Sequence, residues 1–300
     1  MTNNLTAGEF QALTGLAAKA LRLYGEREIV TPAFVDPSSG YRYYAPTQIQ
    51  HGVLVDLLRR ARVPLTELAS ASDFSFERWR ETVALNRHLE DFYLQVAERI
   101  TNFDAADFVA RSSPAPAVDW VGVTIELVIP EGAEDKKDAF EGLAVYTPAL
   151  ERAFIEAFSD LEIATSPVSW SVVPDVGRRN GNDMMQLAWA VLELPASDSL
   201  DSIAAHVRSA TGRSVEVVSG TLPQRLEVTF VDSSTSAPTP VDEASAGYLH
   251  ALAFQNHIAQ HNLSPIRHTA RQVSLRGPLF EAAQTSVDGL VNVFDVNLPD

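Results

Sequence analysis

Two groups of side chains near the start of the chain have the chemistry to bind phosphate. They are Lys19, Arg22 and Tyr24, spaced for one helix, and the consecutive Tyr41, Arg42 and Tyr43. Guanidinium and phenol groups donate hydrogen bonds to phosphate oxygens at defined geometry, which suits a nucleic-acid backbone. A salt bridge within the helix is the alternative role for Arg22. Because successive strand residues face opposite ways, one of Tyr43 and Tyr44 is expected in a core.

Four aromatic residues further along could wall a cavity for an organic ligand. They are Trp170 and Trp189, on strands expected to pair, and Phe254 and Phe294. Rings of this size line most small-molecule sites, although each one singly is better explained as core. Trp170 and Trp189 together are the favoured pair.

Several other chemistries lack the residues they need. The chain has no cysteine, which excludes disulfides, thiolate metal sites and cysteine nucleophiles. His250, His257 and His261 recur at helical spacing, but no HExxH or neighbouring carboxylate completes a metal site, so an ordinary helix face is preferred. We therefore expect no metal, no cofactor and no catalytic residue.

The elements that would position the basic residues follow a winged-helix plan. The pattern predicts a helix capped by Thr6 and Glu9, a turn at Gly15, a helix over 17–28, a hairpin over 34–44, and helices over 46–62 and 65–69. Two short helices joined by a Gly-bearing turn form a helix-turn-helix, whose second helix usually enters the DNA groove.

The motifs of this segment resemble the N-terminal domain of MerR-family regulators over residues 5–70. They are Ala20-Leu-Arg-Leu-Tyr24, Thr31-Pro-Ala, Val35-Asp-Pro and above all Gly40-Tyr-Arg-Tyr-Tyr44. The resemblance is greatest to members that sense drugs and other organic cations or amphiphiles. It implies that the helix and wing Arg and Tyr residues contact double-stranded promoter DNA. Leu23-Tyr24-Gly25 stands where the family has Tyr-Tyr-Asp, and Thr31 and Phe34 stand where basic residues are frequent, so donors to phosphate are lost.

Residues 74–103 contain neither glycine nor proline and predict one amphipathic helix. Its apolar stripe is Leu85, Leu89, Phe92, Val96, Ile100 and Phe103. The family resemblance implies that this helix pairs antiparallel with a second copy. The alternative is packing on the chain's own C-terminal domain; we favour the homodimer.

Beyond a linker expected over 112–117, one order of elements occurs twice. The predicted strands and helices are strand 121–129, helix 148–163, strands 168–173 and 184–194, then strand 222–231, helix 244–262 and strands 267–275 and 291–298. A repeated β-α-β-β unit suggests two facing halves around a cleft. This order resembles the GyrI-like effector-binding domain, with 217–223 and Pro299 as its best markers.

Cation-sensing GyrI-like domains carry a glutamate, flanked by aromatics, on a strand of the second repeat. The matching position here is Gln272, with Arg271 beside it and Ser274 where an aromatic is common. A neutral amide favours an uncharged or mixed-polarity ligand over a cation.

Charge is distributed unevenly along the chain. Of the net −16, residues 1–70 carry +1 from seven Lys/Arg and six acids, which leaves −17 on residues 71–300. An acidic remainder repels DNA, so binding would rest on few cations and be sensitive to salt. No apolar run is long enough to span a bilayer and no leader is present, so we expect a cytoplasmic protein without membrane contact.

Together these features predict an α+β chain of three parts: a MerR-type winged helix-turn-helix over 1–72, a linker and dimerisation helix over 74–111, and a GyrI-like small-molecule-binding domain over 115–300. The leading function is a one-component transcription regulator that senses an amphiphilic or aromatic molecule, with RNA polymerase as a further partner. The alternative is a drug- or metabolite-sequestering protein with a weakened DNA-binding module. Hydrolysis, known for some GyrI-like domains, is disfavoured because Gln272 occupies the position of the acid.

Overall fold

The computed structural model divides into two compact units, residues 1–85 and 86–300. The described residues are 4–68, 74–127, 133–174, 178–179, 182–233, 238–274, 278–279 and 290–298, without the side chains of 133–145 and 178. None of the helices in these ranges combines the length and the apolar character that a membrane span requires.

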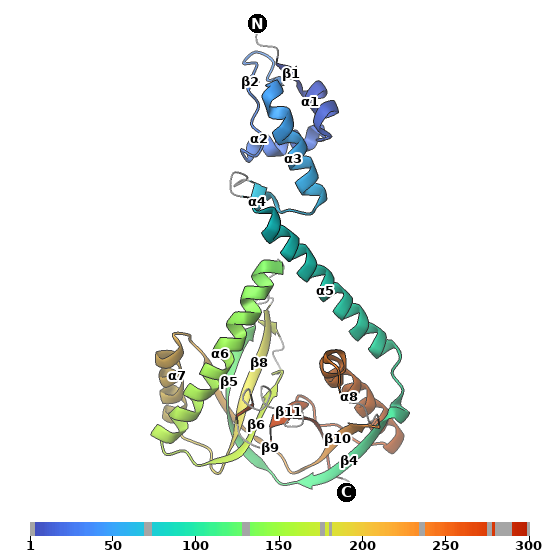
Figure 1. Cartoon of the computed structure of the whole chain (residues 1–300). Coiled ribbons are helices and arrows are strands. Elements are labelled where there is room, and N and C mark those ends of the chain that lie inside the picture. The colour runs from blue at the N-terminus through green and yellow to red at the C-terminus, as the bar shows by residue number, and fades with distance from the viewer. Residues whose placement is uncertain are drawn as a thin grey trace. The chain divides into compact units, whose positions relative to one another are not determined.

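The N-terminal unit has the predicted helix-turn-helix and wing. Its elements are β1 (Leu5–Thr6), α1 (Ala7–Thr14), α2 (Ala18–Glu26), β2 (Phe34–Val35), β3 (Arg42–Tyr44), η1 (Pro46–Gln48), α3 (Ile49–Arg60) and α4 (Leu65–Leu68), with strand order β1-β3-β2 (Figure 1). The predicted cap is present: Thr6 Oγ1 accepts from the Glu9 N–H at 3.2 Å, and the Glu9 carboxylate accepts from the Thr6 N–H at 2.8 Å. Gly15, at φ +79°, ends α1 and turns the chain toward α2.

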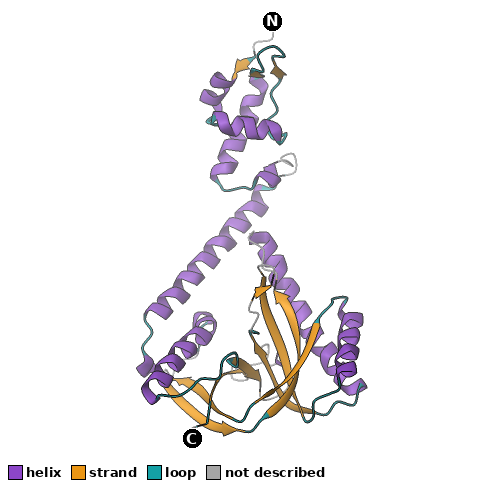
Figure 2. Cartoon of the chain, turned by 180° about the vertical axis from the view of Figure 1, so that it is seen from behind, coloured by secondary structure: helices purple, strands orange, loops and turns teal. Residues whose placement is uncertain are grey.

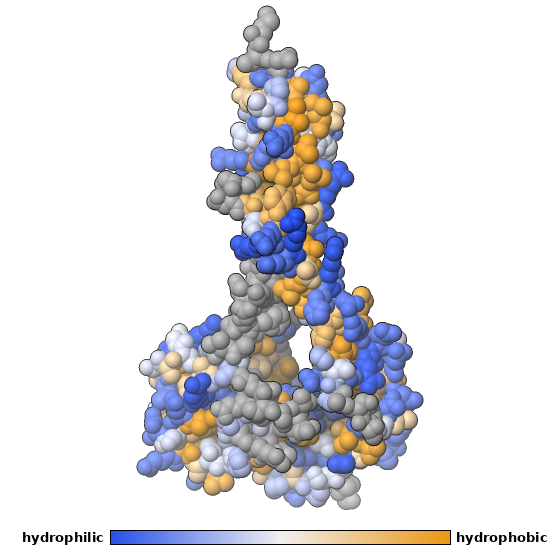
Figure 3. Space-filling model, viewed as in Figure 1, coloured by the Kyte–Doolittle hydropathy of each residue, from blue (hydrophilic) through white to orange (hydrophobic). Residues whose placement is uncertain are grey.

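A small aromatic core holds this unit together. The rings of Phe10 and Tyr44 stack at 4.3 Å between centroids, and both side chains are fully buried. Gly52 of α3 lies directly on α1: a Cβ there would come within 2.6 Å of Thr14 Cγ2 and 2.8 Å of Phe10 Cζ. The close approach of α1 and α3 therefore requires glycine. On the outside, α3 exposes apolar surface (Figure 3), and Leu57 is 56% exposed.

Helix α5 (Phe76–Thr101) confirms the predicted long helix and contributes to both units. At its start, Trp79 Nε1 donates to the Ala61 carbonyl at 3.2 Å. Near its end, Arg99 pairs with Asp232 at 3.3 Å and Asp242 at 3.4 Å. Each end of α5 is thus anchored in its own unit.

The C-terminal unit is built on one antiparallel sheet. Its elements are η3 (Ala105–Asp107), β4 (Phe108–Ala115), β5 (Val118–Leu127), α6 (Ala133–Asp160), β6 (Thr165–Val172), β7 (Arg178–Arg179), β8 (Asn182–Val191), α7 (Ser197–Thr211), β9 (Glu216–Leu222), β10 (Arg225–Asp232), α8 (Pro240–His261), β11 (Arg271–Ser274) and β12 (Leu290–Val296). The strand order is β4-β10-β12-β11-β6-β8-β5-β9, with β7 paired to β8. The predicted β-α-β-β order is present twice, as β5-α6-β6-β8 and β10-α8-β11-β12, and the two halves meet at β6 and β11.

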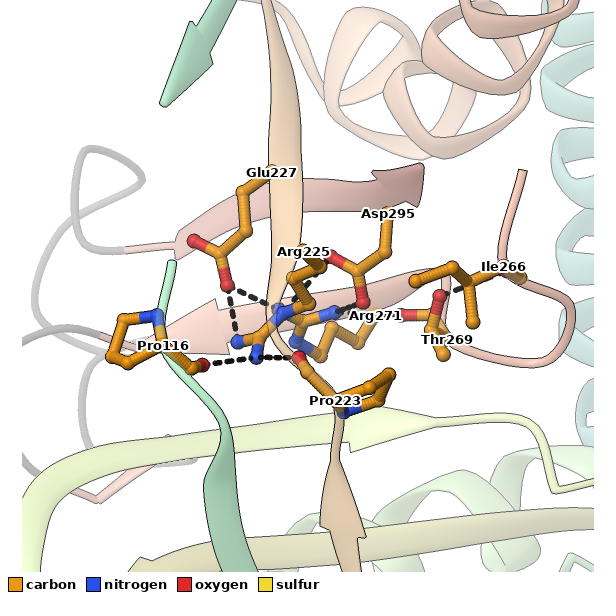
Figure 4. Close-up of polar contacts among 8 residues, drawn as sticks. All are labelled: Pro116, Pro223, Arg225, Glu227, Ile266, Thr269, Arg271 and Asp295. Atoms are coloured by element: carbon orange, nitrogen blue, oxygen red, sulfur yellow. Dashed lines mark hydrogen bonds and ion pairs between the residues drawn. The ribbon is translucent and has the colours of Figure 1, made fainter. Parts of the chain in front are cut away.

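The outer strands exchange between the halves, which the sequence did not predict. Strand β4 precedes β5 but pairs with β10, and β9 precedes β10 but pairs with β5. The expected linker over 112–117 is wrong, because most of it belongs to β4; α7 and β9 were also missed. The chain crosses over after Pro116 and Pro223, and Arg225 Nη1 donates to both of these carbonyls, at 2.9 and 3.0 Å (Figure 4).

All three long C-terminal helices lie on the same face of the sheet. Val123 and Leu187 pack under α6 and α7, while Val228 and Phe294 pack under α8. Leu187 pairs with Ser171, Ser171 with Gln272, and Gln272 with Asn292, so this face is continuous across both halves. Figure 2 shows the helices flanking the strongly curved strands. We call the other side of the sheet the open face.

Candidate DNA-binding surface and ligand pocket

The wing turn is shaped by Asp36. Its Oδ1 accepts from the Ser38 N–H at 2.8 Å, the Ser38 hydroxyl at 2.6 Å and the Ser39 N–H at 3.3 Å. Hydrogen bonds from Ser38 and then Ser39 lower the pKa of Asp36 to about 2. Gly40 takes φ +68° and donates its N–H to the Asp36 carbonyl at 2.8 Å, so the Asp-Pro-Ser-Ser-Gly run forms a closed turn.

This turn presents polar aromatic residues on the wing. Phe34 pairs with Tyr43 in register, and Tyr41 packs against Tyr43 at 5.4 Å between ring centroids. Tyr41 is 48% exposed, and Arg42 and Tyr43 are partly exposed. Tyr44 is the core member of the adjacent pair, as expected for one of the two, and burial raises its pKa. Tyr41, Arg42 and Tyr43 are therefore accessible to a ligand.

Helix α2 exposes two of the three side chains that were predicted to contact DNA. Lys19 and Arg22 are exposed, and Arg22 Nε lies 3.1 Å from Glu26 Oε1 in a solvent-exposed i,i+4 pair. Such pairs are weak, so Arg22 can exchange Glu26 for a phosphate. Tyr24 is only 6% exposed and belongs to the core with Leu21. Its prediction as a DNA-contacting residue is therefore not supported, because its ring lies on the buried side of the helix.

A pocket of about 590 Å³ opens on the helix-bearing face of the sheet against α8. We call it the helix-side pocket; it is lined by Leu127, Ser171, Val172, Val173, Asp183, Met184, Met185, Gly247, Ala251, Ala270, Arg271, Gln272, Asn292 and Phe294. Exposed Gln272 presents its amide there, and Asn292 Nδ2 lies 3.1 Å from His250 Nδ1. Burial lowers the pKa of His250, which favours the neutral ring beside this amide. The pocket combines an apolar wall with neutral polar groups and two charged side chains, Asp183 and Arg271.

The structure separates the predicted ligand residues. Gln272 and Phe294 line the helix-side pocket, and Phe254 lies behind Phe294, stacked on it at 4.8 Å. Ser274 is fully buried further along β11, and its hydroxyl has no hydrogen-bond partner among the described residues. Two of these four residues therefore reach the pocket.

Trp170 and Trp189 do not form the favoured pair. Their strands do pair as predicted, but Trp189 lies opposite Ser169 and Trp170 opposite Ala188, so the two indoles point to opposite faces. Trp189 packs under α6 and donates Nε1–H to the Ser166 carbonyl at 2.7 Å. Trp170 faces the open side of the sheet. One cavity cannot contain both rings.

A buried cluster of four charges on the open face was not predicted (Figure 4). Arg271 pairs with Asp295 at 2.5 Å and with Glu227 at 2.6 Å, and Arg225 pairs with Glu227 at 2.5 Å and with Asp295 at 3.4 Å. Two guanidiniums and two carboxylates balance each other, which makes burial tolerable. The signal available in the sequence was Asp295 inside the apolar run Val293–Val296.

Two of the three α8 histidines lie side by side. The rings of His257 and His261 lie 4.5 Å apart between centroids. In the described part of the chain, no three His, Asp or Glu side chains gather at metal-binding distances.

Comparison with known proteins finds a sequence match over part of the chain. No family model matches the chain. The chain is 39% identical over 70 residues to the multidrug-efflux transporter 1 regulator of Bacillus subtilis (strain 168), which is 23% of this chain and 25% of that protein. The match is about the length of the winged module and spans a quarter of that relative.

Solved structures align more widely but more loosely. The EcmrR–DNA complex in EcmrR-RPo aligns over 98% of both chains with 14% identity and a TM-score of 0.36. A hydrolase from Listeria innocua aligns over 63% of this chain and 91% of its own length, with 9% identity and a TM-score of 0.32. Scores this low do not establish a common fold, so the function of the C-terminal unit rests on its own geometry. The identity over 70 residues to the Bacillus regulator agrees with the resemblance drawn from the wing and the helix-turn-helix of the N-terminal unit.

Proposed function

We propose that this chain is a one-component DNA-binding transcription regulator that senses a small amphiphilic or aromatic molecule. The observation that carries the proposal is the wing, where Tyr41, Arg42 and Tyr43 are accessible beside a hydrogen-bonded turn. Lys19 and Arg22 on α2 supply further donors to phosphate. The relative with 39% identity over 70 residues is named as a regulator, which supports the same reading.

The protein acts as a homodimer that grips two half-sites and works with RNA polymerase. Residues of α5 leave apolar surface uncovered, with Leu94 69% exposed and Tyr93 60% exposed. Neither residue belongs to the predicted stripe, and a second copy of α5 packed on this helix would cover apolar surface of this kind. Three cations from each protomer give a dimer only about six phosphate contacts, and hence a slope of log affinity against log salt of about −5.

The effector occupies the helix-side pocket. Its volume of about 590 Å³ is that of a small-molecule site. Gln272 and Asn292 provide neutral amides, and Phe294 provides an aromatic wall. Asp183 and Arg271 add one charge of each sign, so an uncharged or mixed-polarity molecule suits the pocket better than a bare cation. A ligand with different affinity for the DNA-bound and free arrangements would shift the balance between them.

Anisotropy of a labelled duplex taken from the region upstream of the chain's own coding sequence tests DNA binding. We expect Arg42→Ala to weaken binding and to make the salt slope shallower by about 1 per bound protomer. Arg208→Ala is the matched control, since it removes an exposed arginine from α7 in the other unit. An Arg42→Ala slope equal to that of wild type would contradict the assigned surface.

A sequestering protein is the second candidate, and charge favours it. Residues 1–85 contain nine Lys/Arg and nine acids and are neutral, so the whole net charge of −16 lies on residues 86–300. If wild type fails to bind the duplex even at low salt while a ligand still enters the helix-side pocket, this function replaces the regulator.

A further inference from the structure

A second pocket lies on the open face of the sheet, away from the helices. It has a volume of about 340 Å³ and involves β5, β6, β8, β9 and β11. We call it the open-face pocket. Trp170 forms part of its floor and is 3% exposed, and Trp120 stands against it edge-on at 6.4 Å between ring centroids. Met184 and Val218 add apolar surface.

Gln186 points into this pocket without a protein partner. The residue is 7% exposed and lines the pocket, and its side-chain amide makes no hydrogen bond to the described residues. The amide of this largely buried side chain therefore keeps its donors and its acceptor for a water or a ligand in the pocket. Its N–H and C=O lie side by side, so one molecule with a matching acceptor and donor can satisfy both.

Two strand glycines make room for the aromatic wall. A Cβ on Gly220, which pairs with Trp120, would come within 2.8 Å of the indole Cζ2, and one on Gly122 would come within 3.0 Å of Gln186 Nε2. Glycine inside a strand weakens the sheet. The glycines at these two positions are explained by the room that they leave for the Trp120 ring and the Gln186 side chain.

The charged groups described around the pocket are already paired. Arg271 is engaged by Asp295, by Glu227 and by the Thr269 carbonyl at 2.9 Å. Arg179 at the rim lies 2.8 Å from Glu216. The pocket therefore offers no strong attraction to an ion, and its selectivity comes from the indoles and the amide.

We propose that the open-face pocket is a second small-molecule site, selective for a neutral, flat aromatic compound that carries a lactam or primary amide. The rings stack against Trp120 and Trp170, and the lactam N–H and C=O pair with the Gln186 side chain. The site differs from the effector site of the proposed function, because Gln186 lines only the open-face pocket and Gln272 only the helix-side pocket, although Val172, Met184 and Arg271 border both.

Calorimetric titration of the full chain with 2-quinolinone, and with naphthalene as the counterpart lacking the lactam, tests this site. We expect saturable 1:1 binding of 2-quinolinone, at least about tenfold tighter than naphthalene. Gln186→Leu should abolish this preference, while Gln272→Leu, the matched change in the helix-side pocket, should leave it unchanged.

The melting temperature of the same variant serves as the control for correct folding. Gln186→Leu keeps the volume and removes an unsatisfied amide, so its melting temperature should equal or exceed that of wild type. The proposal is overturned if 2-quinolinone shows no saturable binding up to about 1 mM, if it binds no tighter than naphthalene, or if Gln272→Leu rather than Gln186→Leu removes the preference. None of these results depends on DNA binding.

Discussion

Replacing Asp295 with asparagine removes one of the four charges buried on the open face of the C-terminal sheet. The Asp295 side chain is fully buried on β12 and pairs with Arg271 of β11 and Arg225 of β10. After the change, two guanidiniums share only Glu227, which is itself partly exposed. Breaking a buried pair by removing one partner costs about 3–5 kcal/mol, because the remaining charge is left uncompensated.

That loss is large against the free energy of unfolding of a typical domain, about 5–15 kcal/mol. For a unit of this size it should lower the melting temperature by roughly 6–20 °C. Tryptophan fluorescence during thermal unfolding reports mainly on the C-terminal unit, because Trp120, Trp170 and Trp189 lie in it and only Trp79 lies in the N-terminal unit.

Two comparison variants make the test sharp. Glu216→Gln breaks the exposed pair with Arg179 and should cost no more than about 1 kcal/mol. The double variant Arg271→Met/Asp295→Leu replaces the buried pair with apolar side chains and should recover most of the lost stability. A free energy of unfolding for Asp295→Asn within about 1 kcal/mol of that of wild type would refute the claim that the buried charge pairs stabilise the sheet.

Further predictions concern packing and pH. Gly52→Ala should destabilise the N-terminal unit by about 1–3 kcal/mol through overlap with Thr14 and Phe10, whereas Gly8→Ala, with open space around it, should not; thermal unfolding followed by circular dichroism compares them. Because burial lowers the pKa of His250, the unfolded chain takes up protons first as pH falls below about 6.5, so stability present at pH 7.5 is lost toward pH 5.5. In urea unfolding, His250→Gln should reduce the dependence of the free energy of unfolding on pH. An unchanged dependence would contradict the role given to His250.

Local chemistry explains why the N-terminal unit was predictable. The Thr6–Glu9 cap, the Gly15 turn and the Asp36–Gly40 turn each depend on residues a few positions apart. Tyr24 was the error there, and the signal was available: it lies three residues after Leu21, on the same side of α2, while Lys19 and Arg22 share the other side.

Long-range pairing explains why the C-terminal unit was predicted less well. Strand β4 contains Pro114, which an edge strand tolerates, and it pairs with β10 more than a hundred residues later. The separation of Trp170 from Trp189 depends on the register between β6 and β8, and a shift of one residue would reverse it. Alternation within one strand shows which residues share a face, but only the register shows which faces coincide across strands.

Transcription in a purified system tests the central claim most directly. The template is the region upstream of the chain's own coding sequence, with RNA polymerase and either the wild-type chain or Arg42→Ala. A regulator predicts that the wild-type chain changes the yield of transcript, in either direction, and that Arg42→Ala changes it much less while Arg208→Ala acts as wild type. Equal transcript yields with and without the wild-type chain, at a salt concentration low enough to permit weak phosphate contacts, would contradict the claim.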